Sequence, residues 1–108
     1  MATIDDFKKI EIRVGRILSA ERVLDSEKLV KLQVSFGEQG ERQIIAGLAP
    51  YFEDPQTLVG GKYAFAFNLE PRMLMGLESQ GMVLAAGESG AFSLLSVGSS
   101  VAEGSAVR

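Results

Sequence analysis

The sequence predicts an all-β fold, a small β-barrel with short helical insertions, in a single domain over residues 1–108. Three observations support this prediction. Five or six short segments show the alternation of apolar and polar residues that is typical of half-buried strands. The first segment is long and contains a glycine, and the connection after the third contains prolines that favour helical turns. The length of 108 residues suits one domain with one core.

The first part of the chain predicts a short helix and then a long strand. Thr3 and Asp6 have the spacing with which a hydroxyl and a carboxylate cap a first helical turn. Apolar and charged residues then alternate over residues 10–14, and an apolar run continues to Val23. Gly15 interrupts this strand, so we expect a bulge or sharp bend there, as in a barrel strand that serves two sheets.

The next segments predict a hairpin. Residues 24–27 have the composition of a turn. Apolar and polar residues alternate without a break over residues 30–36, the clearest strand of the sequence. A glycine-bounded turn at residues 37–40 should connect it to a third strand at residues 43–46.

The second half of the chain predicts three more strands. Residues 47–61 should form a loop with helical turns near 50–52 and 54–58. The expected strands are residues 63–69, 82–86 and 92–97, with no regular period between 70 and 80 and weakly anchored turns from 98 to the end. The arrangement is typical of an oligonucleotide-binding (OB-fold) barrel, although a β-sandwich would show the same alternation.

The chain contains neither cysteine nor histidine. This excludes disulfides, zinc sites built from these residues, and catalysis by an imidazole base. The paired acids Asp5/Asp6 and Glu53/Asp54 are sequence neighbours, which rarely face one reaction centre. We therefore expect no catalytic residues, no metal and no cofactor, and a binding module that is not an enzyme by itself.

Charge is unevenly distributed along the chain. The net charge is −3, but residues 1–31 contain seven of the eleven basic residues. An electropositive surface must therefore come mainly from the first third, with Arg42, Lys62 and Arg72 as additions. The acidic N-terminus does not resemble a secretory signal, and no apolar run is long enough for a membrane helix, so we expect a cytoplasmic protein without membrane contact.

Residues 68–82 form an unusual connection between two predicted strands. They contain three of the four methionines, although a surface connection is normally polar. They also contain Asn68, Arg72, Ser79 and Gln80, whose side chains suit phosphates and base edges. Two simpler interpretations stay open, in which the methionines plug the barrel end and Ser79 and Gln80 cap local turns.

Five motifs in order carry a resemblance to a known family. They are DFKKIEIRVGRI at residues 6–17, EKL at 27–29, AGL at 46–48, NLEPR at 68–72 and SQGM at 79–82. The chain resembles the tRNA-binding domain that occurs at the C-terminus of many bacterial and archaeal methionyl-tRNA synthetases and as stand-alone tRNA-binding proteins. It departs from many members at Glu70 and Met73, where those members carry lysine or arginine nearby.

The resemblance implies an OB-fold homodimer that binds structured tRNA by shape and backbone contacts, since duplex RNA offers mainly phosphates and 2′-hydroxyls. It also implies a function in protein biosynthesis, either alone or with the catalytic part of methionyl-tRNA synthetase (methionine–tRNA ligase). The residues implied to contact phosphates are Arg13, Lys28, Lys31 and Arg42, and those implied to form the docking face are Asn68, Arg72, Ser79 and Gln80.

A second hypothesis is a peptide-binding, export-type chaperone of the same fold, because a methionine-rich surface with acidic charge suits apolar peptides. For the homodimer, we expect an interface built from exposed apolar residues or, failing that, the same residues in the core. These residues are Leu74, Leu77, Leu94, Leu95, Val101 and Val107.

Overall fold

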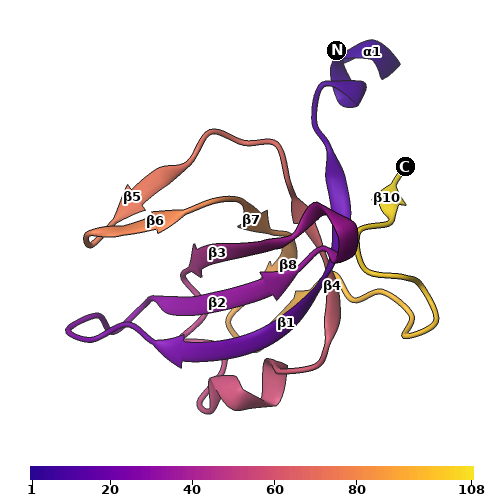
Figure 1. Ribbon diagram of the computed structural model, residues 1–108. Helices are drawn as coiled ribbons and strands as arrows, with labels where there is room; N and C mark the ends of the chain where they lie inside the picture. Colours follow the sequence, from indigo (N-terminus) through magenta and orange to yellow (C-terminus); the bar gives the residue numbers. More distant parts are fainter.

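The computed structural model describes all residues from 1 to 108 and consists almost entirely of β-structure. The elements are α1 (Ile4–Lys8), β1 (Ile12–Arg22), β2 (Val30–Ser35), η1 (Gly37–Gln39), β3 (Glu41–Ala46), η2 (Pro55–Leu58), β4 (Lys62–Ala66), β5 (Arg72–Leu74), β6 (Leu77–Ser79), β7 (Met82–Val83), β8 (Ala85–Glu88), β9 (Ala91–Leu94) and β10 (Ala106–Val107). The main sheet has the order β3-β2-β1-β4-β7, with β10 also paired to β1. It curls into a half-barrel (Figure 1), which confirms the predicted all-β class.

Strand β1 serves both parts of the curled sheet, as predicted. Its first half pairs with β4 and its second half with β2. The predicted irregularity at Gly15 lies further along, because the register shifts between Ile17 and Ser19. Gly15 is needed for packing instead: an added Cβ would lie 2.5 Å from Cγ1 of Val34 and 2.8 Å from the ring of Phe65.

The core lies on the concave side of the sheet. The apolar residues of β2 (Val30, Leu32 and Val34) are fully buried, and the polar residues between them are only half-buried, as the alternation predicts. Phe36 and Phe65 are also buried and meet edge to face with ring centroids 5.4 Å apart. Burial of each such side chain stabilises the fold by about 1.5–3 kcal/mol.

The helical segments are short and mostly lie where the sequence predicts them. The Thr3 hydroxyl accepts from the amide of Asp6, whose carboxylate accepts from the amide of Thr3, so the capping box of α1 is complete. Helix α1 projects from the body of the molecule, and η2 lies in the loop between β3 and β4 (Figure 1). No helix has the length and apolar character needed to cross a membrane.

The prediction for residues 70–80 is wrong, because this segment forms the hairpin β5–β6. Met75 and Gly76 form its two-residue turn, with φ of 49° and 79°. A two-residue hairpin turn of type I′ needs positive φ at both central residues, and the usual first residue is asparagine, aspartate or glycine rather than methionine. The predicted strand at 82–86 is also interrupted, because β7 pairs with β4 whereas β8 pairs with β9.

Candidate functional site

Ser79 and Gln80 complete the free edge of β3. The amide of Gln80 donates to the carbonyl of Gln43 at 2.8 Å, and the amide of Gln43 donates to Oε1 of Gln80 at 3.0 Å. The amide of Ile45 donates to Oγ of Ser79 at 3.0 Å, and Ser79 is only 4% exposed. Two side chains thus bind amides that would otherwise form an open sheet edge. The hydroxyl of Ser79 is occupied inside the protein.

Asn68 fixes the chain that enters β1. Its Nδ2 donates to the carbonyl of Lys9 at 2.8 Å, and its Oδ1 accepts from the amide of Glu11 at 2.7 Å. The amide of Phe67 donates to the carbonyl of Glu11 at 2.7 Å beside it. Asn68 therefore uses both ends of its amide to hold residues 9–11 against the end of β4.

Arg42 lies over the ring of Phe67. Its Cζ is 3.8 Å from the ring centroid, and its Nη1 donates to the carbonyls of Phe67 at 2.8 Å and Gln80 at 3.3 Å. It forms no salt bridge, so its charge is not neutralised by a carboxylate. An arginine over an aromatic ring is held in one orientation while its remaining N–H groups stay available.

Arg42 and Asn68 meet in a groove of about 420 Å³ at this end of the barrel. Glu11, on the same groove, pairs with Arg13 at 2.5 Å between Oε1 and Nε. Arg13 also donates to the carbonyl of Gly104 at 2.7 Å, so its charge and donors are largely used within the protein. We call this site the Arg42 groove; its lining residues are Glu11, Arg42, Phe67, Asn68, Leu69, Pro71 and Gln80.

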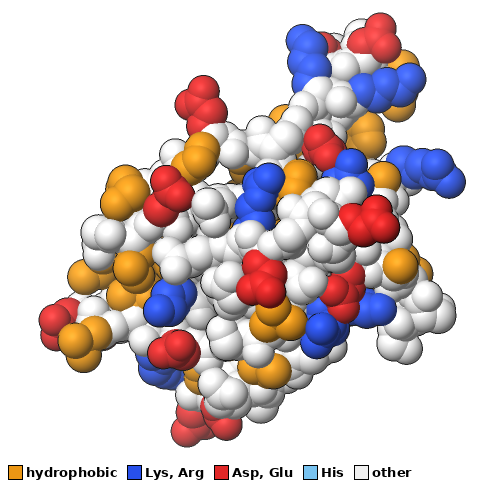
Figure 2. All heavy atoms as spheres, in the orientation of Figure 1, with side chains coloured by type: hydrophobic (Ala, Val, Ile, Leu, Met, Phe, Trp, Pro, Cys, Tyr) orange, Lys and Arg blue, Asp and Glu red, His pale blue; other side chains and the backbone are white.

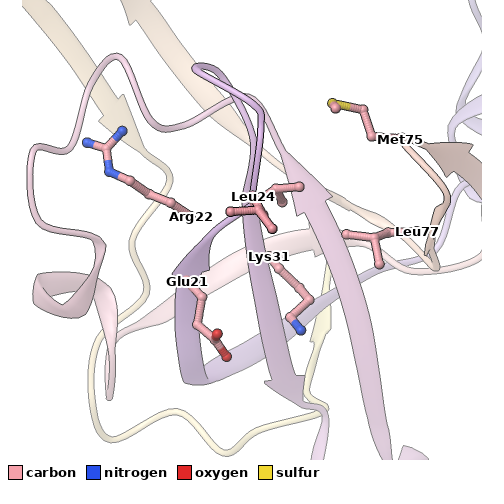
Figure 3. A pocket seen from close by; sticks show the side chains of 7 residues that line it. Glu21, Arg22, Leu24, Lys31, Met75 and Leu77 are labelled. Carbon is pink, nitrogen blue, oxygen red and sulfur yellow. The ribbon is translucent and has the colours of Figure 1, made fainter.

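A second hollow, of about 360 Å³, lies at the far end of the β5–β6 hairpin (Figure 3). Met75 and Leu77 approach it from the hairpin, and Lys31 from β2. Arg22 points away, toward the loop between β3 and β4, where it donates to the carbonyls of Phe52 and Glu53. We call it the Lys31 hollow; its lining residues are Glu21, Arg22, Val23, Leu24, Lys31, Met75 and Leu77.

The hairpin connects the two concavities. Pro71 and Gln80 flank its base at the Arg42 groove, and Met75 lies at its tip beside the Lys31 hollow. Arg72, Lys28 and Lys31 make no side-chain hydrogen bond or ion pair. The structure thus leaves four of the eight predicted site residues with charge to offer a ligand, namely Lys28, Lys31, Arg42 and Arg72. We call the surface that comprises Arg72 on the hairpin and the two concavities with Arg42 and Lys31 the hairpin face. Lys28 lies in the turn between β1 and β2.

Basic and acidic side chains alternate on the side of the molecule shown in Figure 2, without a large patch of one sign. Apolar side chains gather near the tips of the β5–β6 hairpin and the β1–β2 turn. Met73, Met75 and Met82 are 65%, 59% and 48% exposed, so the interpretation that they plug the barrel end is wrong. Their exposure instead provides adaptable apolar contact area.

The C-terminal segment is bound to β1 and β2 by a cluster that the sequence did not indicate. Oε2 of Glu103 accepts from the hydroxyl of Ser35 at 2.6 Å, and Oε1 accepts from Nε of Arg16 at 2.5 Å. These bonds, that of Ser35 first, lower the pKa of the Glu103 carboxyl below its ordinary value. Its partners are 68 and 87 residues away in sequence, so no local signal could have found them.

The chain is similar in sequence to proteins of a known family. Residues 12–106 match the family model described as "Putative tRNA binding domain". A methionine–tRNA ligase from Caldanaerobacter subterraneus subsp. tengcongensis is 46% identical over 105 residues, which are 97% of this chain and 16% of that protein. The chain thus spans about a sixth of that curated relative.

Two solved structures share the fold over the whole chain. A MetRS related protein from Pyrococcus horikoshii has a TM-score of 0.92 at 38% identity, covering 100% of this chain and 98% of that one. The chaperone CsaA from Bacillus anthracis str. Ames has a TM-score of 0.88 at 27% identity, covering 100% and 99%.

Proposed function

The chain belongs to the tRNA-binding domain family, and we propose that it binds structured tRNA through the hairpin face, as a barrel of the OB type. The observation that carries this proposal is the position of Arg42, which lies over Phe67 in a groove and has no carboxylate partner. Such a guanidinium is oriented before any ligand arrives, which lowers the entropic cost of binding.

We assign different functions to the eight candidate residues. Lys28, Lys31, Arg42 and Arg72 contact the RNA, because their charges are not paired with carboxylates. The remaining four, Arg13, Asn68, Ser79 and Gln80, position the groove through their hydrogen bonds to the backbone, and Asn68 and Gln80 also line it. With few free cations, binding is salt-sensitive and moderate in strength.

The binding module acts in protein biosynthesis, either alone or attached to a methionine–tRNA ligase. The matching segment is 16% of the length of that relative, which leaves most of the relative's chain for a catalytic domain. A tRNA-binding module attached to such a body would raise the effective concentration of tRNA near the active site. In this setting the protein would act in the cytoplasm.

We also propose a homodimer, with an interface that overlaps the expected one only at Val107. Leu94 is buried in the core, and Leu74 and Leu77 lie on the hairpin. The apolar side chains of the projecting N-terminal segment are exposed to solvent: Ile4, Phe7 and Ile10 are 66%, 47% and 43% exposed. Together with the exposed Val107 on β10, which pairs with the start of β1, they suit a two-fold contact.

A titration of labelled tRNA against the protein at low and at physiological salt tests the proposed function. We expect micromolar or tighter binding at low salt that weakens as salt rises. Absence of binding in the micromolar range at low salt would contradict the proposal.

A second candidate is peptide binding, since the chaperone CsaA has the same fold and three methionines of this chain are exposed. Flexible methionine side chains suit apolar peptides of varied sequence. Competition separates the two candidates. An unfolded polypeptide that displaces tRNA from the protein, or that binds when tRNA does not, would favour the chaperone function.

A further inference from the structure

The charge inside the Arg42 groove does not suit a phosphate. Glu11 lines this groove beside Arg42, and its side chain is 40% exposed. Its Oε1 accepts from Arg13, whereas its Oε2 has no partner. A phosphate here would lie near a carboxylate, which repels it and offsets the attraction of the single free cation, Arg42.

The same groove has the components of a nucleobase site. The guanidinium of Arg42 covers Phe67 on one side and lines the groove as well, so it offers a planar cationic surface. Leu69 and Pro71 add apolar walls, and Oε2 of Glu11 is an acceptor without a donor. Nε2 of Gln80 is a free donor, because only its Oε1 is used, by the amide of Gln43.

We propose that the Arg42 groove takes one unstacked nucleobase of the bound tRNA. This inference rests on the proposed function and adds a base contact to the backbone contacts of the hairpin face. The base stacks on the Arg42 guanidinium, and an amino or imino N–H on its edge donates to Oε2 of Glu11. Single-stranded loops supply such bases, and proteins often stack them on arginine planes.

Two substitutions distinguish a base from a phosphate. Arg42→Lys keeps the charge but removes the planar surface. A stacked base predicts about tenfold weaker tRNA binding with an unchanged dependence of affinity on salt. Glu11→Gln removes the repelling charge and leaves a weaker acceptor. A base predicts about fivefold weaker binding for it, whereas a phosphate predicts tighter binding.

The measurement is titration of an unmodified tRNA transcript over several salt concentrations. Lys62→Gln is the control for Glu11→Gln and Arg42→Lys, because the Lys62 ammonium donates to the carbonyls of Ser99 and Val101 and lies outside the groove. Circular dichroism verifies that each variant is folded. If Arg42→Lys does not fold, the direction in which Glu11→Gln changes the tRNA affinity distinguishes a base from a phosphate.

The outcomes separate this inference from the proposed function. If wild type binds tRNA and both groove variants bind it more weakly, the base site is supported. If wild type binds tRNA but Arg42→Lys binds it equally well, or Glu11→Gln binds it more tightly, the base site is overturned and the proposed tRNA binding stands. A wild-type protein that does not bind the transcript at low salt overturns both.

Discussion

The hydroxyl of Ser79 accepts a hydrogen bond from the amide of Ile45 at 3.0 Å, in a position that is almost fully buried. This bond joins the end of the β5–β6 hairpin to the open edge of β3. Together with the bonds between Gln80 and Gln43, it attaches the hairpin that carries Arg72 to the barrel. The motif SQGM is therefore explained first by sheet closure and only then by ligand binding.

Replacement of Ser79 by alanine should destabilise the protein by about 1–3 kcal/mol, because it leaves the buried amide of Ile45 without an acceptor. Urea unfolding measures this loss. Ser89, which is exposed in the turn between β8 and β9, provides the matched control. Equal stability of the Ser79→Ala and Ser89→Ala variants would contradict the proposed closure of the sheet edge.

Gly15→Ala should destabilise the fold by about 1–3 kcal/mol, since the new methyl group would collide with the side chains of Val34 and Phe65. Gly47→Ala is the control, because nothing lies within 4 Å of a Cβ added there. Thermal unfolding of both variants makes the comparison. A Gly15→Ala protein as stable as Gly47→Ala would mean that the core can accommodate the methyl group.

Glu103 should make stability depend on pH. Its pKa is lowered, first by the Ser35 hydroxyl and then by Arg16, so the ionised carboxylate stabilises the folded state. This contribution is fully present above the ordinary pKa of a glutamate and is lost as pH falls through the lowered value. We expect wild type to exceed Glu103→Gln in urea midpoint at neutral pH, with the difference shrinking in acid. A difference that does not change with pH would argue against this cause.

Arg72→Gln should weaken tRNA binding and reduce the slope of log K against log salt by about 1, as expected for one lost phosphate contact. Arg72 is exposed and unpaired on β5, so the fold should be unaffected. Lys62→Gln removes the same charge away from the hairpin face and should leave the slope nearly unchanged. Equal slopes for wild type and Arg72→Gln would exclude Arg72 as a phosphate contact.

Phe7→Asp should convert the proposed dimer into a monomer, because a carboxylate would have to be buried at the interface. Light scattering gives the mass in solution. Leu24→Asp is the control, since Leu24 is 85% exposed at the other end of β1. A wild-type protein that is already monomeric would rule out the dimer altogether.

Local pattern was sufficient for much of the fold. The alternation in β2 predicted its buried face correctly, and Thr3 with Asp6 predicted the start of α1. These features depend on residues a few positions apart, which is the range over which pleat geometry and capping act. The β5–β6 hairpin was missed because its turn has Met75 at the first position of positive φ, where asparagine, aspartate or glycine normally indicates such a turn.

The sequence by itself determined the all-β class, the strands that surround the core and the types of residue available to a ligand. Only the tertiary structure decided how those residues are used. Ser79 and Asn68 are occupied by backbone groups 34 and 57 or more residues away, whereas Arg42 and Arg72 keep charges without a carboxylate partner. A polar side chain is available to a ligand only if folding has not already satisfied it, and that depends on contacts that no local pattern encodes.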